Sequence, residues 1–118
     1  MSTPAVERSR RALLASISEK RFQADVIRLA HLRGWLVHHS RPAAGRDGRW
    51  STPIEGDAGY VDLTLTRGGR LLFLELKSMT GRTSPAQQEW LSALAKVLGT
   101  EVHVVSPADR DLIDRLLA

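Results

Sequence analysis

The feature that most constrains the fold is a Gly-Gly pair between two alternating segments. Residues 60–66 (YVDLTLT) and 71–77 (LLFLELK) flank Gly68 and Gly69. Such a pair favours a two-residue hairpin turn, because glycine adopts the positive φ angles that this turn needs. The register that follows pairs Arg67 with Arg70, Leu65 with Leu72, Leu63 with Leu74, Asp62 with Glu75, Val61 with Leu76 and Tyr60 with Lys77. One face of the predicted hairpin is then aliphatic, as a buried face requires.

The other face of the hairpin carries an unusual pair of like charges. Asp62 is predicted to lie opposite Glu75, where Cβ atoms are about 4.5–5.5 Å apart and like charges destabilise the pair. Two carboxylates at this spacing provide oxygen ligands for a hard divalent cation such as Mg²⁺. Lys77 follows on the same face. A solvated polar face with a chance acidic pair is the alternative, but charges at 75 and 77 interrupt an apolar run without a structural need.

These residues also carry a family resemblance. The segment GYVD at 59–62, followed by ELK at 75–77, resembles the PD-(D/E)XK nuclease signature and, most closely, the virus-type replication-repair nuclease (VRR-Nuc) domain. The likeness extends over residues 19–107. Its further members are Glu19, Gln23, Gly34, Trp35, the run Ser84-Pro85-Ala86-Gln87, Trp90 and Leu91. The family's usual proline before the aspartate is Val61 here.

The resemblance implies a Mg²⁺- or Mn²⁺-dependent endodeoxyribonuclease with a restriction-endonuclease-like α/β sandwich fold. Asp62, Glu75 and the backbone carbonyl of Leu76 would hold the metal. Lys77 would orient or help to deprotonate the attacking water and stabilise charge in the transition state. A non-catalytic DNA-binding or assembly protein with a degenerate nuclease fold stays open as the alternative, although the complete set of Asp62, Glu75 and Lys77 argues against it.

Two further site residues and the partners also follow from the resemblance. Glu19 of the first family helix would point into the active site, although a helix-terminal acid explains it as well. Gln87 would lie beside the metal, although a helix-capping role explains it locally. Stand-alone members of the family resemble Holliday-junction resolvases that act as homodimers in bacterial or phage-infected cells. We therefore expect DNA, branched DNA included, and a second copy of the chain as partners.

Helix and strand signals give the order α-β-β-β-α-β-α, an α/β class with a mixed four-stranded sheet. The last strand should run parallel to the strand of Glu75, because a helical crossover joins them. The expected elements are a helix from a capping box at 16–19 to Gly34, a strand at 35–39, the hairpin, a helix from Ser84 to Gly99 with Trp90, Leu91, Leu94, Ala95 and Leu98 inward, a strand at 101–105 and a final helix after Ser106.

The segment 40–59 is long for a compact domain and rich in glycine, proline and arginine, which is typical of functional loops. Arginines interleaved with an aromatic residue suit phosphate contact and base stacking. The predicted nucleic-acid-binding residues are Arg41, Arg46, Arg49, Trp50 and, after the hairpin, Arg82. A solvated loop with Trp50 folded onto the core is the alternative.

Length and composition set the remaining bounds. The 118 residues suit one domain, which we place at 18–118 after a basic arm at 1–17 that either frays or touches a partner. The net charge of +4 favours polyanionic partners, and the lack of cysteine excludes thiolate metal sites. No apolar run is long enough for a membrane, so we expect a cytoplasmic location.

Strand alternation places His38 and His39 on opposite faces, which excludes a paired-His metal site.

Overall fold

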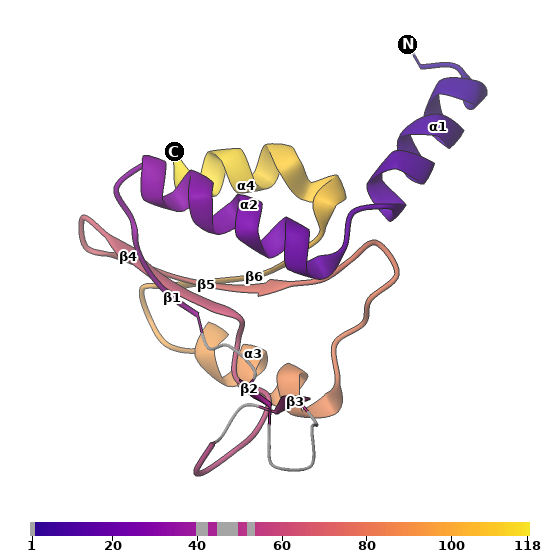
Figure 1. Ribbon diagram of the computed structural model, residues 1–118. Helices are drawn as coiled ribbons and strands as arrows, with labels where there is room; N and C mark the ends of the chain where they lie inside the picture. Colours follow the sequence, from indigo (N-terminus) through magenta and orange to yellow (C-terminus); the bar gives the residue numbers. More distant parts are fainter. Residues whose placement is uncertain (1, 40–42, 45–49, 52–53) are drawn as a thin grey trace.

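The computed structural model describes residues 2–39, 43–44, 50–51 and 54–118 and shows a compact α/β arrangement around a mixed four-stranded sheet (Figure 1). Its elements are α1 (Pro4–Ala15), α2 (Glu19–Leu32), β1 (Leu36–His39), β2 (Ala43–Ala44), β3 (Trp50–Ser51), β4 (Leu63–Arg67), β5 (Arg70–Leu76), α3 (Pro85–Ala95), β6 (Thr100–Val105), the 3₁₀ helix η1 (Pro107–Asp109) and α4 (Arg110–Leu117).

The sheet has the order β1-β4-β5-β6. The first three strands pair antiparallel and β6 pairs parallel with β5, as the sequence predicts. Gly68 and Gly69 have φ angles of 56° and 80°, which the two-residue turn requires. The predicted register is confirmed from Arg67↔Arg70 to Leu63↔Leu74. The ladder ends there, so the predicted strand pairing of residues 60–62 with 75–77 is wrong.

The main core lies between the sheet and the layer formed by α2 and α4, which cover the same face (Figure 1). The aliphatic face of the hairpin supplies much of it: Leu63, Leu65, Leu72, Leu74 and Leu76 are fully buried. The helices add a stripe that period 3.6 predicts, namely Phe22, Val26, Ala30, Ile113, Leu116 and Leu117. Burial of each large apolar side chain contributes about 1.5–3 kcal/mol, so this layer holds the domain together.

Helix α3 covers the opposite face of the sheet, and here the sequence prediction was partly wrong. Its start agrees: Ser84 caps the helix, Pro85 follows and Gln87 completes a capping box. The helix ends at Ala95 rather than at Gly99. Of its predicted inward stripe, Trp90, Leu91 and Leu94 are half-buried, whereas Ala95 and Leu98 are exposed. Periodicity identified the residues that share one side of the helix but not the extent of their burial.

The chain before α2 also differs from the expectation. Residues Pro4–Ala15 form a complete helix, capped by Thr3 and without a buried residue, that projects away from the domain (Figure 1). Ser16 is the C-cap of α1, and Ser18 caps α2 by accepting a hydrogen bond from the amide of Arg21. The predicted capping box of Ser16 with Glu19 is therefore wrong, but the predicted start of the helix near Ser18 is confirmed, because Glu19 is the first residue of α2.

The strand predicted at 35–39 begins one residue later, because Trp35 turns into the core and donates a hydrogen bond from Nε1 to the Leu117 carbonyl at 3.0 Å. The segment predicted as a plain loop contains the antiparallel pair β2–β3, with Ala43 opposite Ser51. Within the described ranges, no helix combines the length and apolar character needed to cross a membrane.

Candidate functional site

Glu75 is the centre of the site, because its side chain has no exposed surface and neither carboxylate oxygen has a hydrogen-bond partner among the described residues. Strand β5 forces this position: the neighbouring leucines face the core, so Glu75 faces the side of α3. Removing an ionised carboxylate from water without a donor or a cation costs several kcal/mol. In the described part of the chain, no other charged side chain is buried.

Asp62 lies beside this carboxyl group at the point where the hairpin ladder ends. Its Oδ2 accepts a hydrogen bond from the Leu76 amide at 2.8 Å. The main-chain N–H of Leu76 thus donates to a side chain instead of to a main-chain carbonyl of the opposite strand. This explains why the pairing of β4 with β5 does not extend beyond Leu63 to Asp62. Asp62 and Glu75 are close, as predicted, but through this side-chain contact rather than as a pair of strand positions.

The proximity of the two acids appears in the pKa of Glu75, which is raised to about 9. Burial is the largest cause, and the neighbouring Asp62 carboxylate raises the pKa further. The charge of Lys77 lowers the pKa again, and that of Glu19 raises it. Without a cation, Glu75 is therefore protonated at neutral pH.

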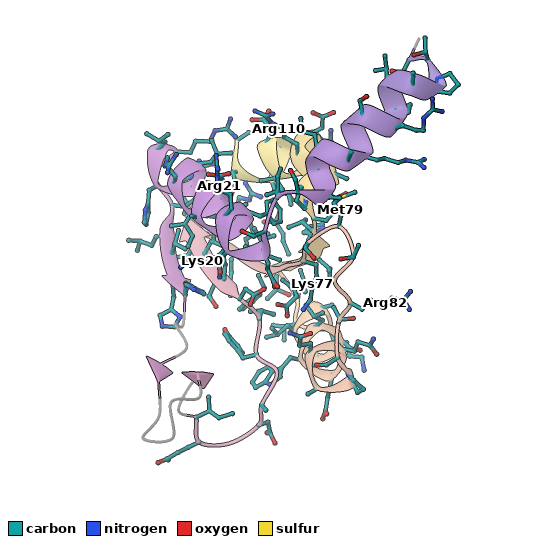
Figure 2. The ribbon with its side chains drawn as sticks, turned by 45° about the vertical axis from the view of Figure 1, so that its right-hand side comes forward. Lys20, Arg21, Lys77, Met79, Arg82 and Arg110 are labelled. Carbon is teal, nitrogen blue, oxygen red and sulfur yellow. The ribbon has the colours of Figure 1, made fainter. Side chains whose placement is uncertain are left out.

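Lys77 follows Glu75 by two residues and is held in place by α3. Its Nζ donates to Gln87 Oε1 at 3.1 Å, and the same oxygen accepts from the Ser84 amide at 2.8 Å. The amide of Lys77 donates to the Val105 carbonyl at 2.9 Å, which extends the pairing of β5 with β6. Gln87 therefore caps α3, as the local sequence predicts, and also holds the ammonium group of Lys77. Its predicted position beside a metal stays a prediction. Figure 2 shows Lys77 near the centre of the molecule.

The segment before Asp62 passes very close to the start of α3, and only glycine permits this. Gly59 has a φ of 94°, and a Cβ atom there would lie 2.5 Å from the main-chain carbon of Ala86. Tyr60 then packs edge-on against Phe73 and Trp90, at centroid distances of 6.5 and 4.9 Å. This contact brings Asp62 and the α3 residue Gln87 to one end of the sheet. The sequence shows that Gly59 belongs to a motif, but it does not show that Ala86 lies against it.

The first turn of α2 and the end of β1 complete the surroundings. Glu19 is exposed, and its influence on the pKa of Glu75 places it within electrostatic reach of the site. His39 Nδ1 lies 2.8 Å from Gln23 Nε2 and 3.2 Å from the Asp62 carbonyl oxygen. The sequence predicts His38 and His39 on opposite faces of the strand. Strand alternation separates them, but only the pairing of His39 with Leu63 identifies which one reaches Asp62.

Among the predicted nucleic-acid-binding residues, only Arg82 has a described side chain. Arg82 is exposed on the loop between β5 and α3 and lies at the margin of the molecule (Figure 2). Arg41, Arg46 and Arg49 lie outside the described residues. Trp50 belongs to β3, but its side chain is outside the described part. Their predicted contacts with DNA therefore stay predictions.

The residues present fit a divalent cation. The two Glu75 oxygens, which have no donor among the described residues, and the neighbouring Asp62 carboxylate are oxygen ligands of the kind that Mg²⁺ and Mn²⁺ prefer. The described side chains contain no cluster of three or more His, Cys, Asp or Glu that could hold a metal. Mg²⁺ commonly binds through one or two carboxylates together with substrate phosphates, so this pair suits a site that the substrate completes.

Comparisons with known proteins give no family assignment. A scan against protein-family models and searches of curated proteins and of solved structures found no significant match.

Proposed function

We propose that this chain is a Mg²⁺- or Mn²⁺-dependent DNA endonuclease that hydrolyses phosphodiester bonds. The observation that carries the proposal is Glu75: a fully buried carboxyl group, without a donor for either oxygen among the described residues, beside a second carboxylate and a lysine. A group with a purely structural role would have a donor within the chain, as buried polar groups usually do. The resemblance of GYVD and ELK to the PD-(D/E)XK signature supports the same reading.

Each residue of the site has a role in this proposal. Asp62, Glu75 and the Leu76 carbonyl would hold the cation, and the charge of Glu19, in the first turn of α2, would add to its negative surroundings. A bound Mg²⁺ or Mn²⁺ supplies Lewis-acid polarisation of the phosphate and lowers the pKa of a water molecule. Lys77, oriented by Gln87, positions the attacking water and stabilises the negative charge that develops on the phosphate oxygens.

The substrate and assembly state follow less directly. A chain with one such site needs a second copy to cut two strands symmetrically, so the proposal includes a homodimer that prefers branched DNA. Sedimentation velocity measures the assembly state. Binding to four-way junctions, flaps and linear duplex of equal length measures the preference. A monomer at all working concentrations without such a preference would contradict this part and leave the nuclease proposal standing.

Cleavage itself is tested with end-labelled junction, flap and linear DNA, each incubated with Mg²⁺, with Mn²⁺ or with EDTA. We expect cleavage by the wild type only with a metal. Glu75→Gln should be inactive, because a neutral amide replaces the buried ligand. Glu89→Gln is the matched control: Glu89 is exposed on α3, so this variant should cleave like the wild type. The inactivity of Glu75→Gln, purified in the same way, excludes a contaminating nuclease, and the active control excludes a general effect of losing one carboxylate.

A wild type that cleaves none of these substrates with either metal would overturn the nuclease proposal. Binding of the same DNA without cleavage would then favour a non-catalytic DNA-binding or assembly protein.

A further inference from the structure

His39 forms a link between α2 and the main chain of the acidic site. It is the last residue of β1 and is half-buried. One ring atom, Nδ1, meets two groups: Gln23 Nε2 at 2.8 Å and the Asp62 carbonyl oxygen at 3.2 Å. Gln23 belongs to α2, and Asp62 directly precedes β4. The ring therefore connects a core helix with the residue that carries one of the two acids.

Asp62 needs such a connection because it lies outside the strand ladder. The β4–β5 pairing ends at Leu63, so Asp62 is not held by main-chain pairing with β5. Its described hydrogen bonds are two: Oδ2 accepts from the Leu76 amide, and the carbonyl meets His39. One bond fixes the side chain and the other fixes the peptide unit from which the side chain projects.

We propose that His39 is a positioning residue that sets the location of the Asp62 carboxylate. A carbonyl oxygen can only accept, so His39 acts in the tautomer that carries its hydrogen on Nδ1. In this tautomer the Gln23 side chain turns its amide oxygen, rather than Nε2, toward the Nδ1 hydrogen, because two donors cannot share a hydrogen bond, and the two acceptors then fix the plane of the ring. In metalloproteins, groups that orient a ligand in this way typically change metal affinity by about 10–100-fold when they are removed. The inference deepens the proposed function, and its consequence for metal binding rests on it.

The chain provides a matched control in the preceding residue. His38 is exposed and projects from the opposite face of β1, so it shares the strand and the residue type without the contact. At position 39, two substitutions separate shape from hydrogen bonding. His39→Phe keeps a planar ring and removes the donor. His39→Asn loses the ring but retains an N–H donor at the position of Nδ1.

The first measurement is amide hydrogen exchange by NMR without metal, because the Leu76 amide directly reports the position of the Asp62 carboxylate. His39→Phe should speed exchange at Leu76 by about fivefold, the factor expected from losing one ordinary hydrogen bond. His39→Asn should restore much of the protection, and His38→Phe should not change it. The adjacent Lys77 amide, held by the Val105 carbonyl, is the internal control for general loosening of β5.

The second measurement is Mn²⁺ titration by calorimetry, which reports binding rather than cleavage. His39→Phe should bind Mn²⁺ about 10–100-fold more weakly than the wild type, while His39→Asn and His38→Phe stay close to it. A wild type that binds no Mn²⁺ would overturn the proposed function, and the Leu76 exchange would still decide whether His39 positions Asp62.

Unchanged exchange at Leu76 in a folded His39→Phe would overturn the inference. So would equal acceleration at Leu76 and Lys77, which indicates general destabilisation. Should His39→Phe fail to fold, Gln23→Ala takes its place, because it leaves the ring present and frees its plane. Gln23→Ala should speed exchange at Leu76 relative to Lys77, and equal exchange at both amides would again overturn the inference.

Discussion

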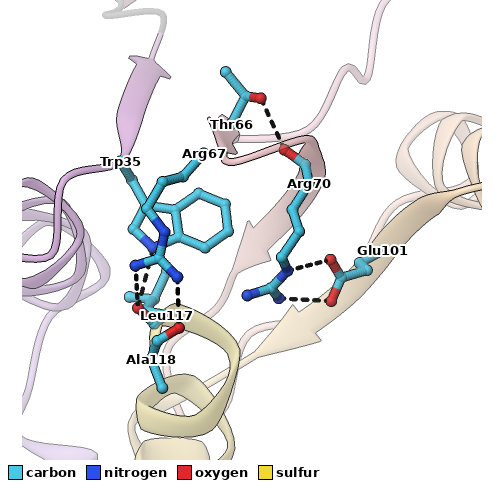
Figure 3. A network of polar contacts seen from close by, with 7 residues as sticks. All are labelled: Trp35, Thr66, Arg67, Arg70, Glu101, Leu117 and Ala118. Atoms are coloured by element: carbon cyan, nitrogen blue, oxygen red, sulfur yellow. Dashed lines mark hydrogen bonds and ion pairs between the residues drawn. The ribbon is translucent and has the colours of Figure 1, made fainter.

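The two ends of the central hairpin each bring like charges together, and they resolve the repulsion in opposite ways. At the turn end, Arg67 faces Arg70, and both guanidinium groups lie over the ring of Trp35, at 4.7 and 4.9 Å (Figure 3). Arg70 forms a two-point ion pair with Glu101, at 2.9 and 2.7 Å. Arg67 donates to the carbonyl oxygens of Arg33, Leu117 and Ala118. Every charge at this end has a partner within the chain.

At the open end, Asp62 and Glu75 meet, and the described residues offer no donor to either oxygen of Glu75. Lys77 is nearby, but its ammonium group is directed to Gln87. The same hairpin thus shows that this sequence can supply partners for a like-charge pair at one end. In the proposed function, a cation and a substrate would be the partners at the other end. The following predictions test that contrast.

Lys77→Ala should produce the largest effect. Cleavage should fall by about 10²–10⁴-fold, the range for loss of a positioned acid–base group, while the melting temperature stays close to that of the wild type. Lys96→Ala is the control, because Lys96 is exposed at the end of α3. The measurement is single-turnover cleavage with saturating Mn²⁺. A near wild-type rate would remove Lys77 from the mechanism.

The matched variant at the turn end is Arg67→Ala, which should show the reverse pattern. Loss of hydrogen bonds from a charged group should lower the free energy of unfolding by about 1.5–3 kcal/mol. Below its melting temperature, the variant should cleave at the wild-type rate. Denaturant unfolding and the same cleavage assay give the two readouts. A large loss of cleavage in folded Arg67→Ala would contradict the proposal that the turn end of the hairpin is structural and the open end is functional.

The metal-free protein should also show opposite pH dependences for the two ends. The pKa of Glu75 is raised to about 9, foremost by burial, so folding favours its protonated form. Its contribution to stability is complete below its unfolded pKa of about 4.3 and is lost as the pH rises towards 9. The limiting slope is a loss of about 1.4 kcal/mol in unfolding free energy per pH unit. Glu75→Gln should remove this slope.

Glu101 should give the opposite dependence of the unfolding free energy on pH. The hydrogen bond from Arg70 lowers the pKa of Glu101, so its contribution is present above the unfolded pKa and is lost as the pH falls through the lower folded value. Chemical denaturation from pH 3 to 9, with Glu75→Gln and Glu101→Gln compared with the wild type, measures both. Difference curves of the same sign for the two variants would contradict the contrast.

Much of this arrangement could be predicted from sequence, and the exceptions have identifiable causes. Gly68 and Gly69 were sufficient to predict the hairpin register, because a two-residue turn leaves one way to align the strands. The prediction failed beyond Leu63, because alternation does not account for a carboxylate that captures the Leu76 amide. The local capping signals predicted the role of Gln87 correctly, since capping depends on four neighbouring residues.

Features that depend on distant segments were not accessible in the same way. The apolar stripe of α3 was predicted to be buried, yet periodicity says which residues share a side of a helix and not what covers them. The approach of Gly59 to Ala86 requires two loops to meet. The contact between His39 and Asp62 depends on the register of β1 with β4, which no tight turn fixes.

Asp62→Asn should distinguish the effect of charge repulsion between Asp62 and Glu75 from the effect of metal binding. The amide oxygen can still accept from the Leu76 amide, while the negative charge beside Glu75 is gone. Without metal, and at a pH where Glu75 is ionised, the variant should therefore be at least as stable as the wild type. Mn²⁺ should raise the wild-type melting temperature by mass action, and the rise should be much smaller in the variant. Thermal melts with Mn²⁺ and with EDTA measure this. Equal stabilisation of both proteins would place the metal elsewhere.

The smallest expected effect concerns the exposed arginine near the open end. Arg82 is exposed on the loop that follows Lys77, whereas Arg70 is held by Glu101 at the turn end. If DNA approaches the open end, Arg82→Ala should lower the log–log salt slope of duplex binding by about 0.9, the value for one lost phosphate contact. Arg70→Ala removes the same charge from the protein and should leave the slope unchanged. Fluorescence anisotropy in EDTA, over a series of salt concentrations, measures binding without cleavage. Equal slopes for all three proteins would mean that Arg82 does not contact the backbone, and a change confined to Arg70→Ala would place the DNA at the turn end instead.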